Sequence, residues 1–158
     1  MRMDGWSMLA DTRPTMVIRP AKSEDFESIV PLLKQLWPAN PIDLKAACDI
    51  LDGGLASDRR AYLCACDGDR IIGFCTLIIR DCLWLQGDVG YICDLVVDQD
   101  HRRSGAGTAL VERVVEIAKQ RRCRRVELDS GFHRTAAHEF YAKRGFEKRA
   151  FLFSRVIE

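Results

Sequence analysis

The feature that most constrains how this sequence can fold is a glycine-rich junction near its middle, over residues 102–110. There an apolar run gives way to an amphipathic stretch, and Gly105 and Gly107 remove the side chains where a helix is expected to begin. The first amides of a helix have no partner within it and lie at the positive end of its dipole, so they form a site for phosphate. Arg102 and Arg103 add fixed positive charge beside them. A glycine pair also occurs at ordinary helix starts, so both interpretations stay open here.

The segments on either side of the junction favour phosphate binding. Residues 89–97 are rich in β-branched and aromatic side chains and predict a buried strand. After the glycines, apolar side chains recur at helical spacing: Leu110, Val111, Val114, Val115 and Ala118. Strand, glycine loop and helix therefore follow in the order that phosphate binding requires. A Rossmann dinucleotide site fits less well, because Leu110 replaces its third glycine and no repeated βαβ unit follows.

Length and composition indicate one domain. A chain of 158 residues that is 47% hydrophobic can bury one core and is short for two. Residues 1–15 lack periodicity and are expected to form a loose N-terminal extension, with a single domain over residues 16–158. The net charge of +1 gives no reason to expect nucleic acid as a partner, and the basic run 121–125 is expected to be a solvated helix end. Without a signal peptide or a long apolar run, we expect a soluble cytoplasmic protein that does not contact membranes.

The seven cysteines favour a reducing compartment over a disulfide framework. Their number is odd, and the chain has neither Cys-x-x-Cys nor a Cys/His cluster with zinc spacing. Cys64, Cys66, Cys75 and Cys93 fall inside apolar runs, where thiols behave as small hydrophobic side chains. We therefore expect buried, reduced thiols and no metal site.

Periodicity and turn residues predict the order of the elements. The predicted strands are residues 16–20, 61–66, 70–79, 89–97, 125–129 and 150–157; helices are predicted at 24–37, at 42–51, after the glycine loop, and at 134–144. Ser23 is expected to cap the first helix and Pro31 to bend or interrupt it. Gly53-Gly54 is expected to end the second helix and Gly145 the last, and residues 67–69 form a hairpin turn. This order predicts an α+β sheet domain.

Two segments carry a family resemblance. Residues 102–107 form an Arg-x-x-Gly-x-Gly loop after a strand ending Asp-Leu-Val-Val-Asp, and residues 137–146 fit Ala-x-x-Phe-Tyr-x-Lys-x-Gly-Phe. Both are similar to segments of the GNAT superfamily of N-acetyltransferases, and the element order resembles that family from residue 16 to the C-terminus. The resemblance implies the acyl-CoA N-acyltransferase fold, with a central mixed but mostly antiparallel sheet flanked by helices. It also implies acetyl-CoA as co-substrate and a homodimer, since many members pair through late strands.

The resemblance assigns cofactor binding to three parts of the chain. The implied cofactor-binding residues are Leu95, Val96, Val97, Arg102, Arg103, Ser104, Gly105, Ala106, Gly107, Thr108, Arg134, Ala137 and Tyr141. Family members often carry Asn where this chain has Arg134, so Arg134 is expected to reach either a phosphate or an anionic group of the substrate. Small Ala137 would let a pantetheine arm lie close to the last helix.

Acetyl transfer requires a neutral amine, a stabilised oxyanion and a proton for the leaving thiolate. A phenol of pKa about 10 carries its proton at neutral pH and can offer it to the leaving sulfur, so Tyr141 is the candidate general acid; core packing is its other interpretation. Amides near Leu95 and Val96, at an expected bulge, would polarise the thioester carbonyl. Asp94 is a candidate base, an anchor for the amine or a structural acid, and Asp129 could share its role. Weaker candidates are the three histidines, His101, His133 and His138.

The sequence leaves the acceptor open. Residues 36–38, Leu-Trp-Pro, resemble a segment of aminoglycoside 6′-acetyltransferases, although a helix ended by proline explains them equally. The run 137–141 resembles aminoalkylphosphonate acetyltransferases. We expect acetyl transfer from acetyl-CoA to a primary amine of a small molecule, aminoglycoside-like, polyamine-like or aminoalkylphosphonate-like, in a pocket formed by the first two helices. The alternatives are a peptide or protein acceptor and a non-catalytic acyl-CoA-binding module, which would need neither Asp94 nor Tyr141.

Overall fold

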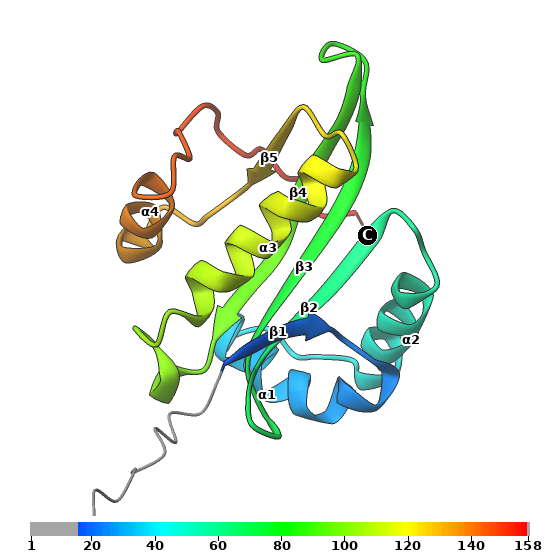
Figure 1. Cartoon of the computed structure of the whole chain (residues 1–158), viewed down its shortest axis with the longest axis vertical. Coiled ribbons are helices and arrows are strands. Elements are labelled where there is room, and N and C mark those ends of the chain that lie inside the picture. Colours follow the sequence, from blue (N-terminus) through cyan, green and yellow to red (C-terminus); the bar gives the residue numbers. More distant parts are fainter. Residues whose placement is uncertain (1–15, 158) are drawn as a thin grey trace, which may run out of the picture.

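One mixed sheet organises the molecule. The computed structural model describes residues 16–157, and the five strands of its sheet lie side by side in sequence order. They are β1 (Val17–Pro20), β2 (Arg60–Asp67), β3 (Arg70–Cys82), β4 (Gly87–Val97) and β5 (Arg125–Leu128). Neighbours from β1 to β4 pair antiparallel, and β5 pairs parallel with β4 (Figure 1). The expected α+β fold is confirmed. The predicted extension, residues 1–15, lies outside the described part of the chain.

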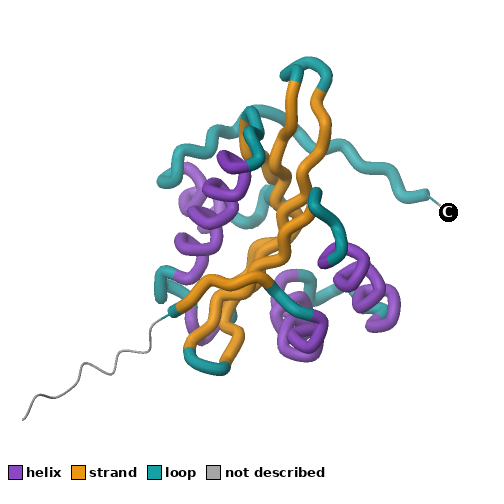
Figure 2. The backbone as a smooth tube through the Cα atoms, turned by 45° about the vertical axis from the view of Figure 1, so that its right-hand side comes forward, coloured by secondary structure: helices purple, strands orange, loops and turns teal. Residues whose placement is uncertain are grey.

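Helices cover both faces of the sheet. They are the short 3₁₀ turns η1 (Ser23–Asp25) and η2 (Gln99–His101) and the helices α1 (Phe26–Leu36), α2 (Leu44–Leu55), α3 (Ala106–Gln120) and α4 (Thr135–Ala142). Figures 1 and 2 show α1 and α2 on one side of the sheet and α3 with α4 on the other. Successive side chains of β2 point to opposite faces of the sheet, so this strand contributes to the hydrophobic core on each face. Leu63 and Ala65 pack in the cluster of α3, whereas Cys64 and Cys66 pack in that of α1 and α2.

The first helix begins later than predicted and passes through its proline. Ser23 belongs to η1, so it does not cap α1. Pro31 lies inside α1 without interrupting it. Proline removes its own N–H, which would have paired with the carbonyl of Glu27, and its ring crowds that same carbonyl. Both residues are exposed, so water can bond to that carbonyl.

The second helix continues through the glycine pair that was expected to end it. α2 runs to Leu55, and its start is capped by Asp43, whose carboxylate accepts from the Ala46 amide at 3.0 Å. A Cβ on Gly54 would lie 2.1 Å from a ring carbon of Tyr62. Gly54 is therefore a point of close contact between α2 and β2, and the prediction of a helix end was wrong.

The C-terminal segment is not the predicted strand. Residues 151–157 have no strand pairing and run away from the body of the molecule (Figure 2). Its large apolar side chains are between 67% and 91% exposed: Phe151, Leu152, Phe153, Val156 and Ile157. The prediction rested on β propensity, but β5 has only four residues and its outer edge stays unpaired by the described chain. A strand without a partner cannot form its ladder.

The cysteines differ in how deeply they are buried. All seven are free, and Cys64, Cys66 and Cys75 are buried as predicted. Cys93 is exposed, so its predicted burial was wrong. Within residues 16–157, no helix combines the length and apolar character needed to cross a membrane.

Candidate active site

The sheet opens between β4 and β5. The two strands pair from Val89 with Arg125 to Ile92 with Leu128. β5 ends there, while β4 continues to Val97. Beyond Ile92, the edge of β4 on this side therefore has no strand partner within the described chain. The resulting gap lies beside residues 93–97, which include several of the predicted site residues.

β4 carries the predicted bulge at the start of this gap. Thr76 pairs with Asp94 and Leu77 pairs with Ile92, so Cys93 is the extra residue. A bulge re-aims the side chains next to it and bends the strand. Here it separates the regular end of β4 from the segment that borders the gap.

The hydrogen-bond ladder fixes which amides face the gap. The Asp98 amide donates to the Ile72 carbonyl at 2.8 Å, on the β3 side. Because ladder bonds alternate along an antiparallel strand, the Val96 amide also faces β3. The amides of Leu95 and Val97 then point toward the gap. Of the amides expected to polarise the thioester carbonyl, that of Leu95 therefore faces the gap and that of Val96 does not; the Val97 amide also faces the gap.

The glycine loop offers the start of α3 to a phosphate group. Gly105 caps the helix with φ of +89°, a left-handed conformation that glycine adopts without strain. A Cβ there would meet open space. The Ala106 amide, the first of α3, donates to the Ser104 hydroxyl at 3.4 Å. The side chains of Arg102, Arg103 and Ser104 are exposed beside this start of the helix. The residues present thus suit a pyrophosphate.

Asp98 supports the chain that leads into this loop. Its buried carboxylate accepts from the Asp100 amide and from the Arg70 guanidinium, both at 3.0 Å. The bond from the Asp100 amide, helped by Arg70, lowers the pKa of Asp98 against the effect of burial. The His101 Nδ1 atom lies 3.8 Å from the same carboxylate. That distance is too long for a hydrogen bond, and the buried Nδ1 atom has no hydrogen-bond partner among the described residues.

Arg144 joins α4 to the start of α3. Its guanidinium donates to the Phe140 carbonyl at 2.8 Å and to the Thr108 hydroxyl, and it lies 3.6 Å from the centroid of the Phe140 ring. A Cβ on Gly107 would approach the same ring to 3.4 Å. Arg144 was not among the predicted site residues, although its position four residues after Phe140 was an available signal.

Tyr141 lies on α4 in an aromatic setting. Its ring meets Phe140 and Phe146 edge-on, with centroids 5.3 Å and 5.6 Å apart. Burial raises the pKa of Tyr141 to about 12, and nearby Cys75 adds to the rise. A coenzyme thiol has a pKa of about 8.5, so this phenol keeps its proton at neutral pH and can offer it to the leaving sulfur, although full transfer to a free thiolate is uphill.

Asp94 links the bulge to a pocket. Its Oδ2 atom accepts from the Thr76 hydroxyl at 2.8 Å, and its amide donates to the same hydroxyl oxygen at 2.9 Å. Thr76 is only 4% exposed, so it holds the carboxylate in one orientation and leaves Oδ1 without a bond to Thr76. Thr76 was missed by the sequence reasoning, because only the register places it opposite Asp94.

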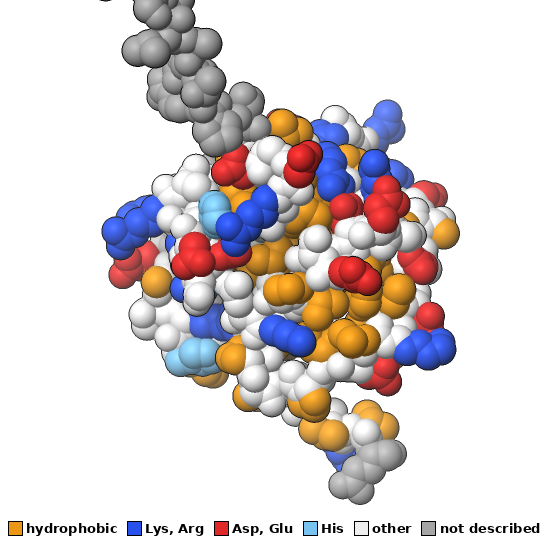
Figure 3. All heavy atoms as spheres, turned by 90° about the horizontal axis from the view of Figure 1, so that it is seen from below, with side chains coloured by type: hydrophobic (Ala, Val, Ile, Leu, Met, Phe, Trp, Pro, Cys, Tyr) orange, Lys and Arg blue, Asp and Glu red, His pale blue; other side chains and the backbone are white. Residues whose placement is uncertain are grey.

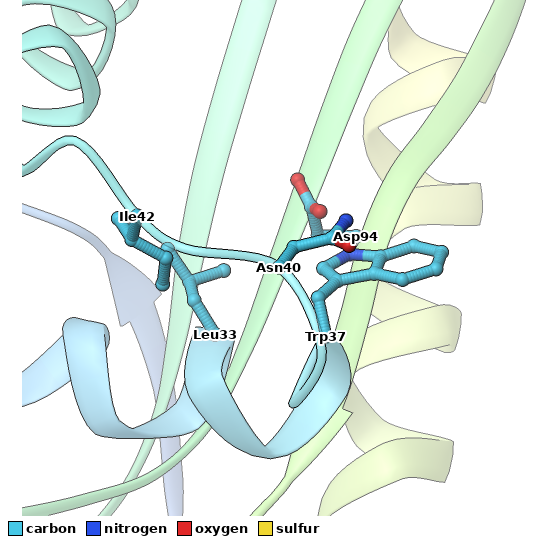
Figure 4. Close-up of a pocket in the computed structure, with 5 residues that line it drawn as sticks. All are labelled: Leu33, Trp37, Asn40, Ile42 and Asp94. Carbon is cyan, nitrogen blue, oxygen red and sulfur yellow. The ribbon is translucent and has the colours of Figure 1, made fainter.

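The pocket lies between the end of α1, the following loop and β4. It is lined by Leu33, Trp37, Asn40, Ile42 and Asp94 and has a volume of about 290 Å³ (Figure 4). The acceptor pocket was predicted at the first two helices; the lining of this pocket comes from α1 and the loop before α2. Asp94 is its contribution from the sheet.

The Arg134 side chain contacts the end of α1, which forms one wall of this pocket. Its guanidinium donates to the Leu36 carbonyl at 2.6 Å and lies 4.8 Å from the centroid of the Trp37 ring. The side chain thus connects the start of α4 to the end of α1. Ala137, one turn along α4, is half-buried.

Of the remaining candidates, Asp129 and His138 have partners of their own, and Asp129 also lies close enough to Tyr141 to add to the rise of its pKa. Asp129 accepts from the Tyr91 hydroxyl, across β4 and β5. His138 bonds through Nε2 to the Gly131 carbonyl at 3.0 Å, and His133 is exposed. Sequence reasoning therefore located the glycine loop, Tyr141 and the Leu-Trp-Pro run that contains Trp37, but not Thr76, which bonds to Asp94, or Arg144, which joins α4 to α3.

Comparison with known proteins gives a consistent result. The sequence matches the Acetyltransferase (GNAT) family over residues 24–146. It is 37% identical over 92 residues to an uncharacterized N-acetyltransferase of Methanocaldococcus jannaschii, covering 56% of this chain but only 39% of that protein. It is 27% identical over 147 residues to the aminoalkylphosphonate N-acetyltransferase of Salmonella typhimurium, covering 93% of this chain and 95% of that one.

A solved structure supports the same assignment. An aminoglycoside N-acetyltransferase in complex with CoA superposes with a TM-score of 0.78 at 26% identity, covering 90% of this chain and 95% of that one. The family match extends from η1 to just past α4 and so includes the bulge, the glycine loop and the pocket. The chain therefore belongs to the GNAT family of acetyl-CoA-dependent N-acetyltransferases.

Proposed function

We propose that this N-acetyltransferase acetylates a primary amine of a small molecule by direct attack, with Asp94 holding the amine and Tyr141 protonating the leaving thiolate. The observation that carries the proposal is the place of Asp94. It stands at the bulge of β4, with the pocket on one side and the amides of Leu95 and Val97 beside it. An amine held by Asp94 would lie next to the groups suited to bind a thioester.

The chain's own residues supply the binding of acetyl-CoA. The first amides of α3 and the side chains of Arg102 and Arg103 suit the pyrophosphate. Ala137 leaves room along α4 for the pantetheine arm, and the gap beside β4 accepts its amide groups. Acetyl-CoA supplies an activated acetyl group as a thioester. The Leu95 amide would polarise its carbonyl oxygen.

The carboxylate and the phenol divide the proton transfers. An alkylamine has a pKa near 10.4 and arrives protonated, so its ammonium group pairs with Asp94 and must lose one proton before attack. Asp94 can accept that proton or pass it to water. Tyr141 keeps its proton at neutral pH because its pKa is raised to about 12. It is therefore available as the acid for the departing thiolate.

Two measurements test the proposal. Calorimetry should show binding of acetyl-CoA, and release of CoA should depend on an added small primary amine. Binding without turnover on any small amine would contradict catalysis on small molecules. Turnover only with peptides or proteins would move the acceptor to that class.

We also propose that two copies pair through the C-terminal segment. Its exposed apolar side chains and the unpaired outer edge of β5 support this, since each copy has both a strand-forming segment and an edge that could receive one. Sedimentation at micromolar concentration should give a dimer for the full chain and a monomer after removal of residues 150–158. A full-length monomer would contradict this pairing.

A further inference from the structure

We propose that the pocket takes a primary amine with an apolar or aromatic body and no acidic group, and discriminates against amines that carry phosphate or phosphonate. This rests on the proposed function above and names the substrate class of the same site. The phosphonate-directed Salmonella relative therefore would not share its acceptor with this chain.

The lining of the pocket is apolar apart from two residues. Leu33, Trp37 and Ile42 are hydrophobic, Asn40 is neutral, and Asp94 is the one charged residue among them. Figure 4 shows Leu33 and Ile42 together on one side and the Trp37 ring close to Asp94 on the other. The only charge in the lining is thus negative. An acidic substrate group would meet repulsion there and no cation to pair with.

The face of the molecule seen from below carries hydrophobic side chains through its middle, with acidic and basic side chains among and around them (Figure 3). The Trp37 ring is 44% exposed at the end of α1. A flat, accessible indole suits the packing of an apolar or aromatic group.

Asp94 is set to receive a single ammonium group. Thr76 donates to its Oδ2 atom at 2.8 Å, so Oδ1 remains for a ligand. Apolar walls strengthen an ion pair by keeping water away from it. One carboxylate among apolar side chains matches a molecule with one cationic group and an apolar remainder.

Arg134 is a cation beside the pocket, on the Trp37 ring, and an acidic substrate group that paired with it would weaken this selectivity. Arg134 does not line the pocket, its guanidinium already donates to the Leu36 carbonyl at 2.6 Å, and it stacks on Trp37. These two contacts hold the guanidinium at the Trp37 wall, outside the residues that line the pocket. Arg134 therefore stiffens the wall of the pocket rather than opening an anion site in it.

The experiment compares two amines with the same two-carbon chain, 2-phenylethylamine and 2-aminoethylphosphonate. From CoA release, kcat/KM should favour 2-phenylethylamine by about tenfold or more. Equal values, or a preference for the phosphonate, would overturn the proposal. The variant Trp37→Ala should remove most of the preference and Trp37→Phe should retain it. Leu83→Ala, at a side chain 95% exposed in the β3–β4 hairpin, is the matched control and should change nothing.

A binding measurement separates this proposal from the proposed function. Replacing Trp6 and Trp84 by Phe leaves Trp37 as the single tryptophan. With CoA present, its fluorescence should respond to 2-phenylethylamine at a concentration at least about tenfold lower than to the phosphonate. If neither amine turns over but this difference is seen, catalysis on small amines fails and the selectivity stands. A response to both at similar concentrations would refute the selectivity whatever the turnover.

Discussion

The two proposed binding regions on either side of the bulge in β4 use different kinds of chemical group. On the proposed cofactor side, the groups are mainly main-chain amides, those of Leu95 and Val97 at the edge of β4 and those at the glycine-bearing start of α3. On the proposed acceptor side, the groups are side chains from distant parts of the chain, as in the contact of Arg134 with Leu36. Binding by main-chain amides should survive most side-chain substitutions and be lost only where a required glycine is replaced. Binding by side chains should weaken step by step as individual contacts are removed.

The largest effect should come from Gly105→Glu on the cofactor side. Glutamate would strain the left-handed backbone and place a negative charge where pyrophosphate binds, so acetyl-CoA binding in calorimetry should be lost. Gly68→Glu is the matched control, because Gly68 also has a left-handed φ, of +57°, in the β2–β3 turn. It should lose stability yet still bind acetyl-CoA. If both variants bind equally well, the glycine loop is not the phosphate site.

Tyr141→Phe should have the next largest effect. It keeps the ring contacts with Phe140 and Phe146 and deletes only the proton donor. Turnover should fall by about 10²–10⁴-fold, while the Kd for acetyl-CoA barely changes. Turnover within threefold of the parent would assign the tyrosine to packing and leave water as the acid.

Arg134→Gln tests whether this residue belongs to the acceptor side. The change removes the stacking on Trp37 and weakens the bond to the Leu36 carbonyl. The KM for the amine should rise by about tenfold, which corresponds to about 1.4 kcal/mol. The Kd for acetyl-CoA should stay within about twofold. A large loss of acetyl-CoA affinity would instead return Arg134 to the cofactor side.

The pH profile should show the smallest effect. A phenol with an ordinary pKa of about 10 would lose its proton, and kcat would fall, as pH rises through 10. Because burial raises the pKa of Tyr141 to about 12, the proton should be retained through that window. With saturating amine, kcat should therefore show no loss centred near pH 10. A Tyr141→Phe profile of the same shape would identify any decline as arising elsewhere, and a Tyr141-dependent decline near pH 10 would contradict the buried setting.

The difference between the two sides also explains what could be predicted from sequence. The glycine loop, the bulge segment and the helix of Tyr141 depend on local chemistry, so contiguous residues reveal them. The prediction for Gly54 was wrong because a glycine is needed there to make room for the Tyr62 ring, which belongs to another element. Residues 150–157 have strand propensity but no partner, and propensity alone cannot supply one. Thr76 and Trp37 acquire their roles only when the sheet register and α1 bring them to Asp94 and Arg134.

The bond from Arg134 to the Leu36 carbonyl crosses 98 residues of sequence and joins the helix of Tyr141 to the wall of the acceptor pocket. Through it, a shift of α4 on loading of the coenzyme would alter how firmly Trp37 is held. Thermodynamic linkage makes such an effect mutual: the factor by which acetyl-CoA tightens amine binding equals the factor by which the amine tightens acetyl-CoA binding. The guanidinium held between α4 and the Trp37 ring is the contact through which such an effect would pass.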